Sequence, residues 1–239
     1  MFNRVIISVV GSSNSGKTTA IELIIKGLTK QGYIVASAKH ITEAEFTIDT
    51  KGKDTWKHAK AGASTILSVA PNELTTIRKM ETKKVALEQL VATIPEETDV
   101  IVTEGFKALV AKDLTIPKIV AIKTDRETKE AFSRYKNILA FVGRAPNQNL
   151  ETNIPFIDPI EEPEKLVELV TKQVGIQVER KRKREEKITI YVNGKILPLG
   201  DFVQNIIRNS VIAMVSSLKG VKIKGEEKVS IVIRELKRG

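Results

Sequence analysis

The chain contains no cysteine and only two histidines among its 239 residues. The absence of cysteine excludes disulfides, thiolate nucleophiles and cysteine-ligated zinc or iron–sulfur sites within this chain. The shortage of histidine argues against a histidine-rich metal centre. No apolar run approaches the roughly 20 residues that span a bilayer, and the strand pattern that begins at Val5 leaves no signal-peptide pattern before it. We therefore expect a cytoplasmic protein that does not bind membranes.

Charge, by contrast, is abundant and unevenly distributed. The formal net charge is +10. Residues 180–239 hold 15 Lys/Arg and 6 Asp/Glu, a balance of +9, whereas residues 1–179 hold 24 and 23, a balance of +1. The basicity therefore belongs to the C-terminal quarter, and the remainder has the composition of an ordinary globular domain.

The sequence GSSNSGKT, Gly11 to Thr18, matches the phosphate-binding pattern G-x-x-x-x-G-K-[ST] without a mismatch. A short β-branched run precedes it, and a helical apolar pattern follows it as far as Gly32. Strand, loop and helix in this order allow main-chain N–H groups and the helix N-terminus to face a phosphate. The predicted nucleotide-binding residues of this loop are Gly11, Asn14, Ser15, Gly16, Lys17, Thr18 and Thr19.

Three side chains are candidates for phosphate or metal chemistry near this loop. Lys17 is predicted to reach the β- and γ-phosphates, which makes it a catalytic candidate, and the Thr18 hydroxyl is predicted to ligate Mg²⁺. The polar segment 46–58 resembles a switch or lid. Within it, Asp49 is either a further Mg²⁺ ligand, directly or through water, or an ordinary turn aspartate.

Polar residues also follow two more predicted strands. Lys39 and His40 follow the second strand, and Glu104 follows a later one. The carboxyl ends of parallel strands line one crevice, so these residues should face the phosphate loop, although His40 could equally be a structural histidine. Glu104 stands where a Walker B acid would, and we predict that it binds Mg²⁺ through water or orients the attacking water. Lys107 is either a second phosphate contact or a solvated lysine.

The sequence Lys123-Thr124-Asp125 follows another predicted strand and has the outline of the guanine-reading N/T-K-x-D loop of GTPases, with Ile122 at its first position. Asp125 would accept hydrogen bonds from N1–H and the exocyclic amine of guanine, which adenine does not offer. The alternative is that Asp125 caps a helix beginning at Arg126.

Predicted strands and helices alternate through residue 178, which indicates a three-layer α/β P-loop NTPase fold with a mostly parallel sheet. Apolar segments at 65–69 and 74–77 predict an antiparallel pair added to the sheet edge. A helix is predicted over 164–174. The loop 145–153 is placed to cover the base.

A second, smaller unit is predicted after this domain. The charge run 179–187 indicates a solvated linker or an exposed helix. Residues 188–239 have the pattern of a small basic α+β module. Its predicted parts are a hairpin around Asn193-Gly194, a helix over about 201–218 and a strand over 229–233.

Five segments together resemble the MobB family, the molybdopterin-guanine dinucleotide biosynthesis adapters. They are residues 11–19, 39–40, 49–56, 61–63 and 102–107. The ordered set is far more specific than any one segment, and the resemblance spans residues 1 to about 175. It departs at Ile41-Thr42-Glu43-Ala44, where the family often has further histidines, so a histidine cluster is not expected.

The resemblance implies a GTP-binding P-loop protein with weak Mg²⁺-dependent GTPase activity. It also implies a homodimer that assists MobA, a guanylyltransferase, in attaching GMP to molybdopterin. The C-terminal module is not part of the minimal family pattern, although extended members are similar in having one.

Two other classes remain open from the residues alone. A P-loop small-molecule kinase would need a lid with arginine contacts, and residues 43–60 contain lysines but no arginine. A nucleic-acid-binding NTPase could use the +9 C-terminal module, but no aromatic residues are interleaved with its charge run.

Overall fold

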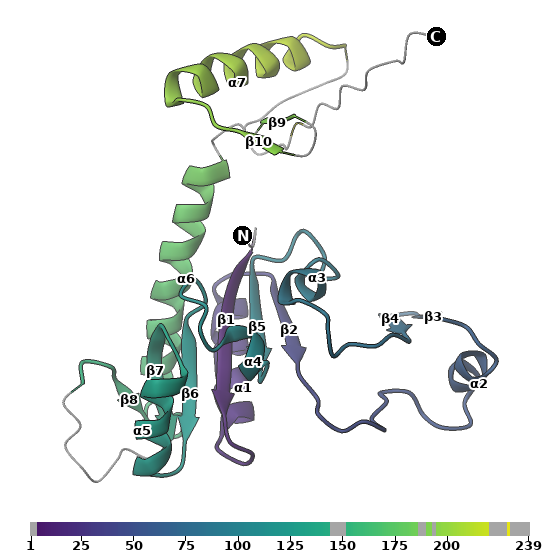
Figure 1. The fold of residues 1–239 in the computed structure, drawn as a ribbon, viewed down its shortest axis with the longest axis vertical. Coiled ribbons are helices and arrows are strands. Elements are labelled where there is room, and N and C mark those ends of the chain that lie inside the picture. The colour runs from purple at the N-terminus through teal and green to yellow at the C-terminus, as the bar shows by residue number, and fades with distance from the viewer. Residues whose placement is uncertain (1–3, 144–151, 186–189, 193–194, 220–228, 230–239) are drawn as a thin grey trace. The chain divides into compact units, whose positions relative to one another are not determined.

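A six-stranded parallel sheet forms the centre of the computed structural model, which describes residues 4–143, 152–185, 190–192, 195–219 and 229 (Figure 1). The strand order is β2-β5-β1-β6-β7-β8, and each neighbouring pair is parallel. This confirms the predicted α/β fold class. The strands are β1 (Val5–Gly11), β2 (Val35–Lys39), β5 (Val100–Glu104), β6 (Lys118–Ile122), β7 (Ile138–Gly143) and β8 (Phe156–Ile157).

Helices cover both faces of this sheet, because both faces of each central strand are apolar. In β1, Ile7 and Val9 face one side and Ile6 and Val10 the other, as the two-residue period of a strand requires. The first side packs against α1 (Lys17–Lys30) and α6 (Pro163–Glu185). The second packs against α3 (Leu87–Val91), α4 (Lys107–Val110) and α5 (Asp125–Arg134). The result is the three-layer arrangement that the sequence predicts.

Residues 41–86, here called the excursion, leave the sheet after β2. They contain α2 (Asp54–Lys60) and a hairpin of β3 (Thr65–Ala70) and β4 (Glu73–Arg78). The two strands are confirmed, but their predicted addition to the sheet edge is wrong, because they form a separate two-stranded sheet. α2 packs against β3, and Ile66 of β3 is buried. The hairpin therefore packs against the neighbouring helix α2 and not against the central sheet. The long polar segment before α2 places both elements away from β2 (Figure 1).

The last helix of the first unit is longer than predicted. α6 extends to Glu185, through most of the charge run expected to be a linker or an exposed helix. The chain divides into two compact units, residues 1–178 and 179–239, and α6 ends in the second. No helix within the described residues is long and apolar enough to cross a membrane.

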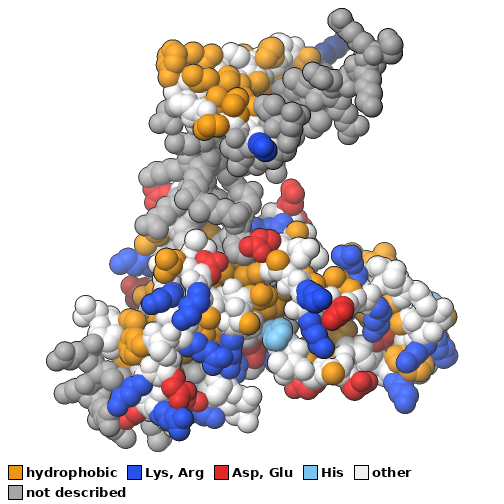
Figure 2. Space-filling view, in the orientation of Figure 1, with side chains coloured by type: hydrophobic (Ala, Val, Ile, Leu, Met, Phe, Trp, Pro, Cys, Tyr) orange, Lys and Arg blue, Asp and Glu red, His pale blue; other side chains and the backbone are white. Residues whose placement is uncertain are grey.

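The second unit contains an antiparallel pair, β9 (Ile190–Val192) and β10 (Lys195–Leu197), and the helix α7 (Asp201–Ser216). The predicted turn at 193–194 and the predicted strand beyond Val229 lie outside the described residues. Figure 2 shows hydrophobic side chains gathered on α7. The large exposed ones are Phe202, Val203, Ile206 and Met214.

Candidate functional site

The loop between β1 and α1 has the backbone of a phosphate cradle. Gly11 has φ 151°, and a Cβ there would overlap the carbonyl oxygen of Ala121 on the neighbouring strand. Asn14 and Gly16 have φ 56° and 84°, so the loop turns twice through the left-handed region before α1 begins at Lys17. Loops of this kind turn successive N–H groups inward, where they bind anions.

Two side chains brace the loop from within. The hydroxyl of Ser15, which is buried, donates to the carbonyl oxygen of Ser12 over 2.9 Å. The ammonium of Lys17 donates to the same carbonyl. Asn14, Thr18 and Thr19 are exposed. The predicted residues of the loop therefore form one continuous concave segment with Lys17 folded over it.

The ends of β2 and β5 bring three predicted residues to the same edge of the sheet. Lys39 and Glu104 are directly paired in the parallel register, and their side chains form an ion pair with Nζ and Oε1 3.5 Å apart. The main-chain N–H of His40 donates to the carbonyl of Glu104 over 2.9 Å. Glu104 also stands opposite Val9 of β1. Its side chain is only 15% exposed, and its carboxylate is paired with Lys39 at the same edge of the sheet as the phosphate loop.

The end of β6 is fastened directly to the phosphate loop. The ammonium of Lys123 donates to the carbonyl of Ser13 over 3.1 Å, and its main-chain N–H donates to Glu127 Oε2 over 2.6 Å. Thr124 is the N-cap of α5, its hydroxyl accepting from the Glu127 N–H, and Asp125 is the first helical residue. The alternative that Asp125 is the cap is therefore wrong, and Asp125 lies close in sequence to a lysine that contacts the loop.

Glu127 is a residue of this site that the sequence reasoning missed. Burial raises the pKa of the Glu127 carboxyl, but interaction with the Ser12 side chain, the Lys123 N–H and the Lys123 charge outweighs burial, so its pKa lies below the ordinary value. The ionised carboxylate orders the turn that presents Lys123. A signal was available, because Thr124 and Glu127 have the spacing of a capping box.

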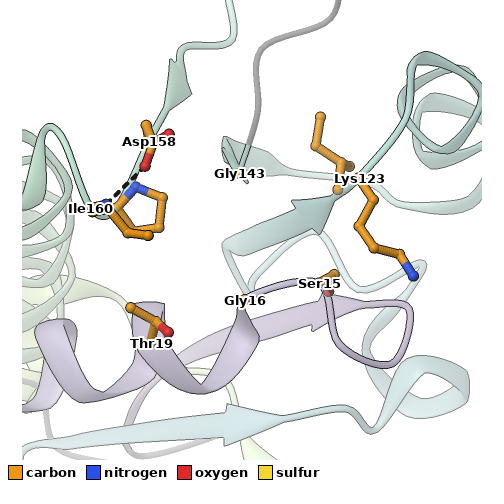
Figure 3. A pocket seen from close by; sticks show the side chains of 9 residues that line it. Ser15, Gly16, Thr19, Lys123, Gly143, Asp158 and Ile160 are labelled. Atoms are coloured by element: carbon orange, nitrogen blue, oxygen red, sulfur yellow. Dashed lines mark hydrogen bonds between the residues drawn. The ribbon is translucent and has the colours of Figure 1, made fainter.

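A cavity of about 340 Å³ opens beside the phosphate loop (Figure 3). Its walls come from the start of α1, the ends of β6 and β7, and the turn after β8. The lining residues are Ser15, Gly16, Thr19, Ile122, Lys123, Gly143, Asp158, Pro159 and Ile160. The predicted base-covering loop lies outside the described residues from 144 to 151. The cavity therefore extends from the phosphate loop along the carboxyl ends of β6 and β7.

The turn at 158–160 was also missed as part of the site. Asp158 Oδ1 accepts from the Ile160 N–H over 2.9 Å, and this turn lines one side of the cavity (Figure 3). The sequence offered one signal, because this turn directly follows a predicted strand, and loops after parallel strands line the carboxyl edge of the sheet.

Comparison with known proteins identifies the family. The family model described as "Molybdopterin guanine dinucleotide synthesis protein B" (MobB) matches residues 6–144. The chain belongs to the MobB family. A putative molybdopterin-guanine dinucleotide biosynthesis adapter protein of Methanocaldococcus jannaschii is 29% identical to it, over 97% of this chain and 99% of the relative.

Solved MobB structures share the fold. A crystal structure of molybdopterin-guanine biosynthesis protein B has a TM-score of 0.55 and 24% identity, covering 72% of this chain and 99% of its own. Bacillus subtilis MobB has a TM-score of 0.54 and 28% identity, covering 71% and 97%. These structures thus leave more than a quarter of this chain unmatched, whereas the match to the Methanocaldococcus relative includes most of residues 179–239.

Asp49, the remaining predicted metal ligand, lies in the excursion. Its Oδ1 accepts from the Thr55 hydroxyl and the Thr50 N–H, each over 2.8 Å, which is the turn role expected as its alternative. Its Oδ2 is buried without a hydrogen-bond partner. Within the described residues, no group of three or more His, Asp or Glu side chains is arranged to hold a metal. The set Thr18, Asp49 and Glu104 stays a prediction.

Proposed function

We propose that this MobB family member binds GTP with Mg²⁺ at the cradle and acts as an adapter in the attachment of GMP to molybdopterin. One observation carries the nucleotide part of the proposal. Lys123 of the K-x-D segment bonds to the phosphate loop over 3.1 Å, so the segment that would read the base and the loop that would hold the phosphates form one unit.

Guanine recognition is assigned to Asp125. Asp125 begins α5, immediately after the cap that Glu127 and Lys123 fix in place. A carboxylate at this position accepts both donors of the guanine Watson–Crick edge. Adenine offers an amine and an unprotonated N1 there, which leaves the carboxylate with an unfavourable contact.

Phosphate and metal binding are assigned to Lys17, Thr18 and Glu104. A Mg²⁺ ion would be held by the Thr18 hydroxyl and, through water, by Glu104, and it would neutralise charge on the phosphate oxygens. The carboxylate of Glu104 is directed at Lys39, with which it forms an ion pair. A paired carboxylate is a poor base, which supports slow hydrolysis and a protein that holds and presents GTP.

The adapter role is inferred from the similarity to the putative molybdopterin-guanine dinucleotide biosynthesis adapter protein of Methanocaldococcus jannaschii. The partner we propose is a MobA-like guanylyltransferase with its molybdopterin substrate. A homodimer is proposed from the excursion. The outward face of the hairpin carries Leu67, Val69 and Leu74, which are 60%, 74% and 67% exposed. An isolated hairpin is marginal in water, and a second copy would bury this face.

Replacement of Asp125 tests the base assignment. The asparagine side chain in Asp125→Asn presents an amide N–H that can donate to the C2 carbonyl of xanthine. The variant should therefore lose about a hundredfold in affinity for GTP and gain affinity for XTP. Glu130→Gln removes an exposed acid from the same helix and should change neither. Calorimetry with Mg²⁺ measures both. Unchanged GTP affinity in Asp125→Asn would remove Asp125 from the site.

The adapter role is tested separately by co-purification. The protein loaded with Mg·GTP should retain a MobA-like guanylyltransferase, and the Lys17→Ala variant should retain less of it. Failure of the GTP-loaded protein to form this complex contradicts the adapter role while leaving the nucleotide assignment intact.

A further inference from the structure

A lysine that the proposed function leaves unused, Lys107, follows Glu104 by three residues. The turn after β5 is tied to β1 by a hydrogen bond from the Gly105 N–H to the carbonyl of Val9, over 3.0 Å. Two residues later Lys107 begins α4. Because Val9 is two residues before Gly11, this turn lies beside the end of β1 that leads into the phosphate loop, on the side of β5.

The backbone of this turn is strained. Gly105 has φ 84° and Phe106 has φ 50°, and a left-handed conformation is costly for a residue as large as phenylalanine. Phe106 is held there by burial, with its side chain 8% exposed and its ring 5.3 Å from that of His40. Strain of this kind persists where the surroundings fix one conformation, and here it fixes the direction in which Lys107 leaves the sheet.

The surroundings of the Lys107 ammonium are predominantly cationic. Its side chain is partly buried, and within the described residues it forms neither a hydrogen bond nor an ion pair. Burial lowers the pKa of Lys107, and repulsion from Arg134 and Lys17 lowers it further, while the charge of Glu127 opposes this only in part. Lys17 is thus one of the charges that lower the pKa of Lys107, and an anion bound near both ammonium groups would offset this repulsion.

We infer that the Lys107 ammonium is a second cationic contact, beside Lys17, for the terminal phosphate of the bound nucleotide. The inference rests on the proposed function and extends it, because it gives the site a means of distinguishing a triphosphate from a diphosphate. Lys17 begins α1 directly after the loop and Lys107 begins α4 shortly after β5, so the γ-phosphate would join two segments that a diphosphate leaves apart.

The order of the strands indicates that a phosphate group, and not the base, would lie near Lys107. The base-reading segment is fastened at β6, on the other side of β1 from β5. The nucleoside therefore lies toward β6 and the terminal phosphate toward β5, where Glu104 and Lys107 are. A solvated lysine would extend into water, whereas the side chain of Lys107 is partly buried.

The test is calorimetry on the full chain with Mg²⁺ and either a non-hydrolysable GTP analogue or GDP. Lys107→Gln should weaken the triphosphate about tenfold, the effect of one charge-assisted contact, and GDP less than about twofold. Lys107→Arg should retain most of the preference for triphosphate. Lys129→Gln removes an exposed lysine from α5 and should change neither affinity.

Retained GDP binding shows that Lys107→Gln is folded, and Lys107→Met, which keeps the buried aliphatic chain, provides a second variant. Equal weakening of both nucleotides, or no weakening of either, overturns the inference alone. If the wild type binds neither nucleotide, the proposed function fails and the inference fails with it.

Discussion

The central sheet buries its apolar residues, whereas the excursion exposes most of its large ones. In the sheet, Ile7, Val9 and Ile101 are fully buried between two layers of helices. In the excursion Ile66 is buried, while most large apolar side chains are exposed. The exposed ones are Phe46, Ile48, Leu67, Val69, Leu74 and Met80, at 52% to 79%. The sheet therefore holds its site rigidly by itself, whereas the excursion has the surface of a segment that binds another molecule.

The largest effect is expected from removing the cation of the cradle. Lys17→Ala should weaken GTP binding at least about a hundredfold, because the β- and γ-phosphates lose their charge-assisted contact. Lys26→Ala removes an exposed lysine from the same helix and should bind GTP normally. Calorimetry measures the affinities, and circular dichroism checks that both variants are folded. Equal GTP affinity in Lys17→Ala and wild type would show that the sheet edge is not the nucleotide site.

The excursion is tested by charging its apolar face. Leu74→Asp should raise the dimer dissociation constant at least about tenfold, because it places an unpaired carboxylate in the proposed interface. Leu114→Asp is a matched control, since Leu114 is 71% exposed and Leu74 67%. Analytical ultracentrifugation measures the dissociation constants. A Leu74→Asp protein that remains as dimeric as Leu114→Asp would place the interface elsewhere.

Packing of α1 on α6 is a smaller test, confined to the first unit. A Cβ at Gly27 would overlap the methyl groups of Val167, and valine has little rotamer freedom with which to move aside. Gly27→Ala should therefore lower the free energy of unfolding by about 1–3 kcal/mol, and Val167→Ala should restore part of it.

The matched control for Gly27→Ala is a second glycine at which alanine should change the free energy of unfolding in the opposite direction. Gly175 lies in α6 with no heavy atom near its missing Cβ, so Gly175→Ala should raise the free energy of unfolding by up to about 1 kcal/mol. Urea denaturation measures both variants. Equal effects at the two glycines would contradict the close approach of α1 and α6.

The smallest effect concerns pH. Lys118 is fully buried with its ammonium bonded to the carbonyl of Asp113, and burial lowers its pKa to about 8 despite the opposing charge of Asp113. Between about pH 8 and pH 10.5 the unfolded chain then binds more protons at Lys118 than the folded chain does, so folded-state stability rises with pH. The free energy of unfolding of wild type relative to Lys118→Met should rise by about 1 kcal/mol from about pH 8 to about pH 9. A constant difference would contradict the shifted pKa.

Local patterns were sufficient to predict most of the sheet and the cradle. The β1–loop–α1 segment is read from consecutive residues, and the rule that carboxyl ends of parallel strands meet brings Lys39 and Glu104 to one edge. The ion pair between them depends on strand register, which places β2 beside β5. The sequence of neither strand predicts this register.

The errors arose where tertiary contacts decide. The hairpin of β3 and β4 has the apolar alternation of an edge strand, yet its connection carries it away from the sheet. The helix predicted over 164–174 continues as α6 to Glu185, through the charge run for which a linker and a helix were both expected, because Arg and Lys are good helix formers. Glu127 accepts a hydrogen bond from the main-chain N–H of Lys123. A glutamate at this position does not by itself predict that contact.

The central claim is that the cradle and the K-x-D segment form one guanine nucleotide site. Calorimetric titration of the wild-type protein with Mg·GTP and with Mg·ATP tests it most directly. We predict that ATP binds at least about a hundredfold more weakly than GTP, because Asp125 finds both of its donors only on guanine. Equal affinity for the two nucleotides would contradict the claim.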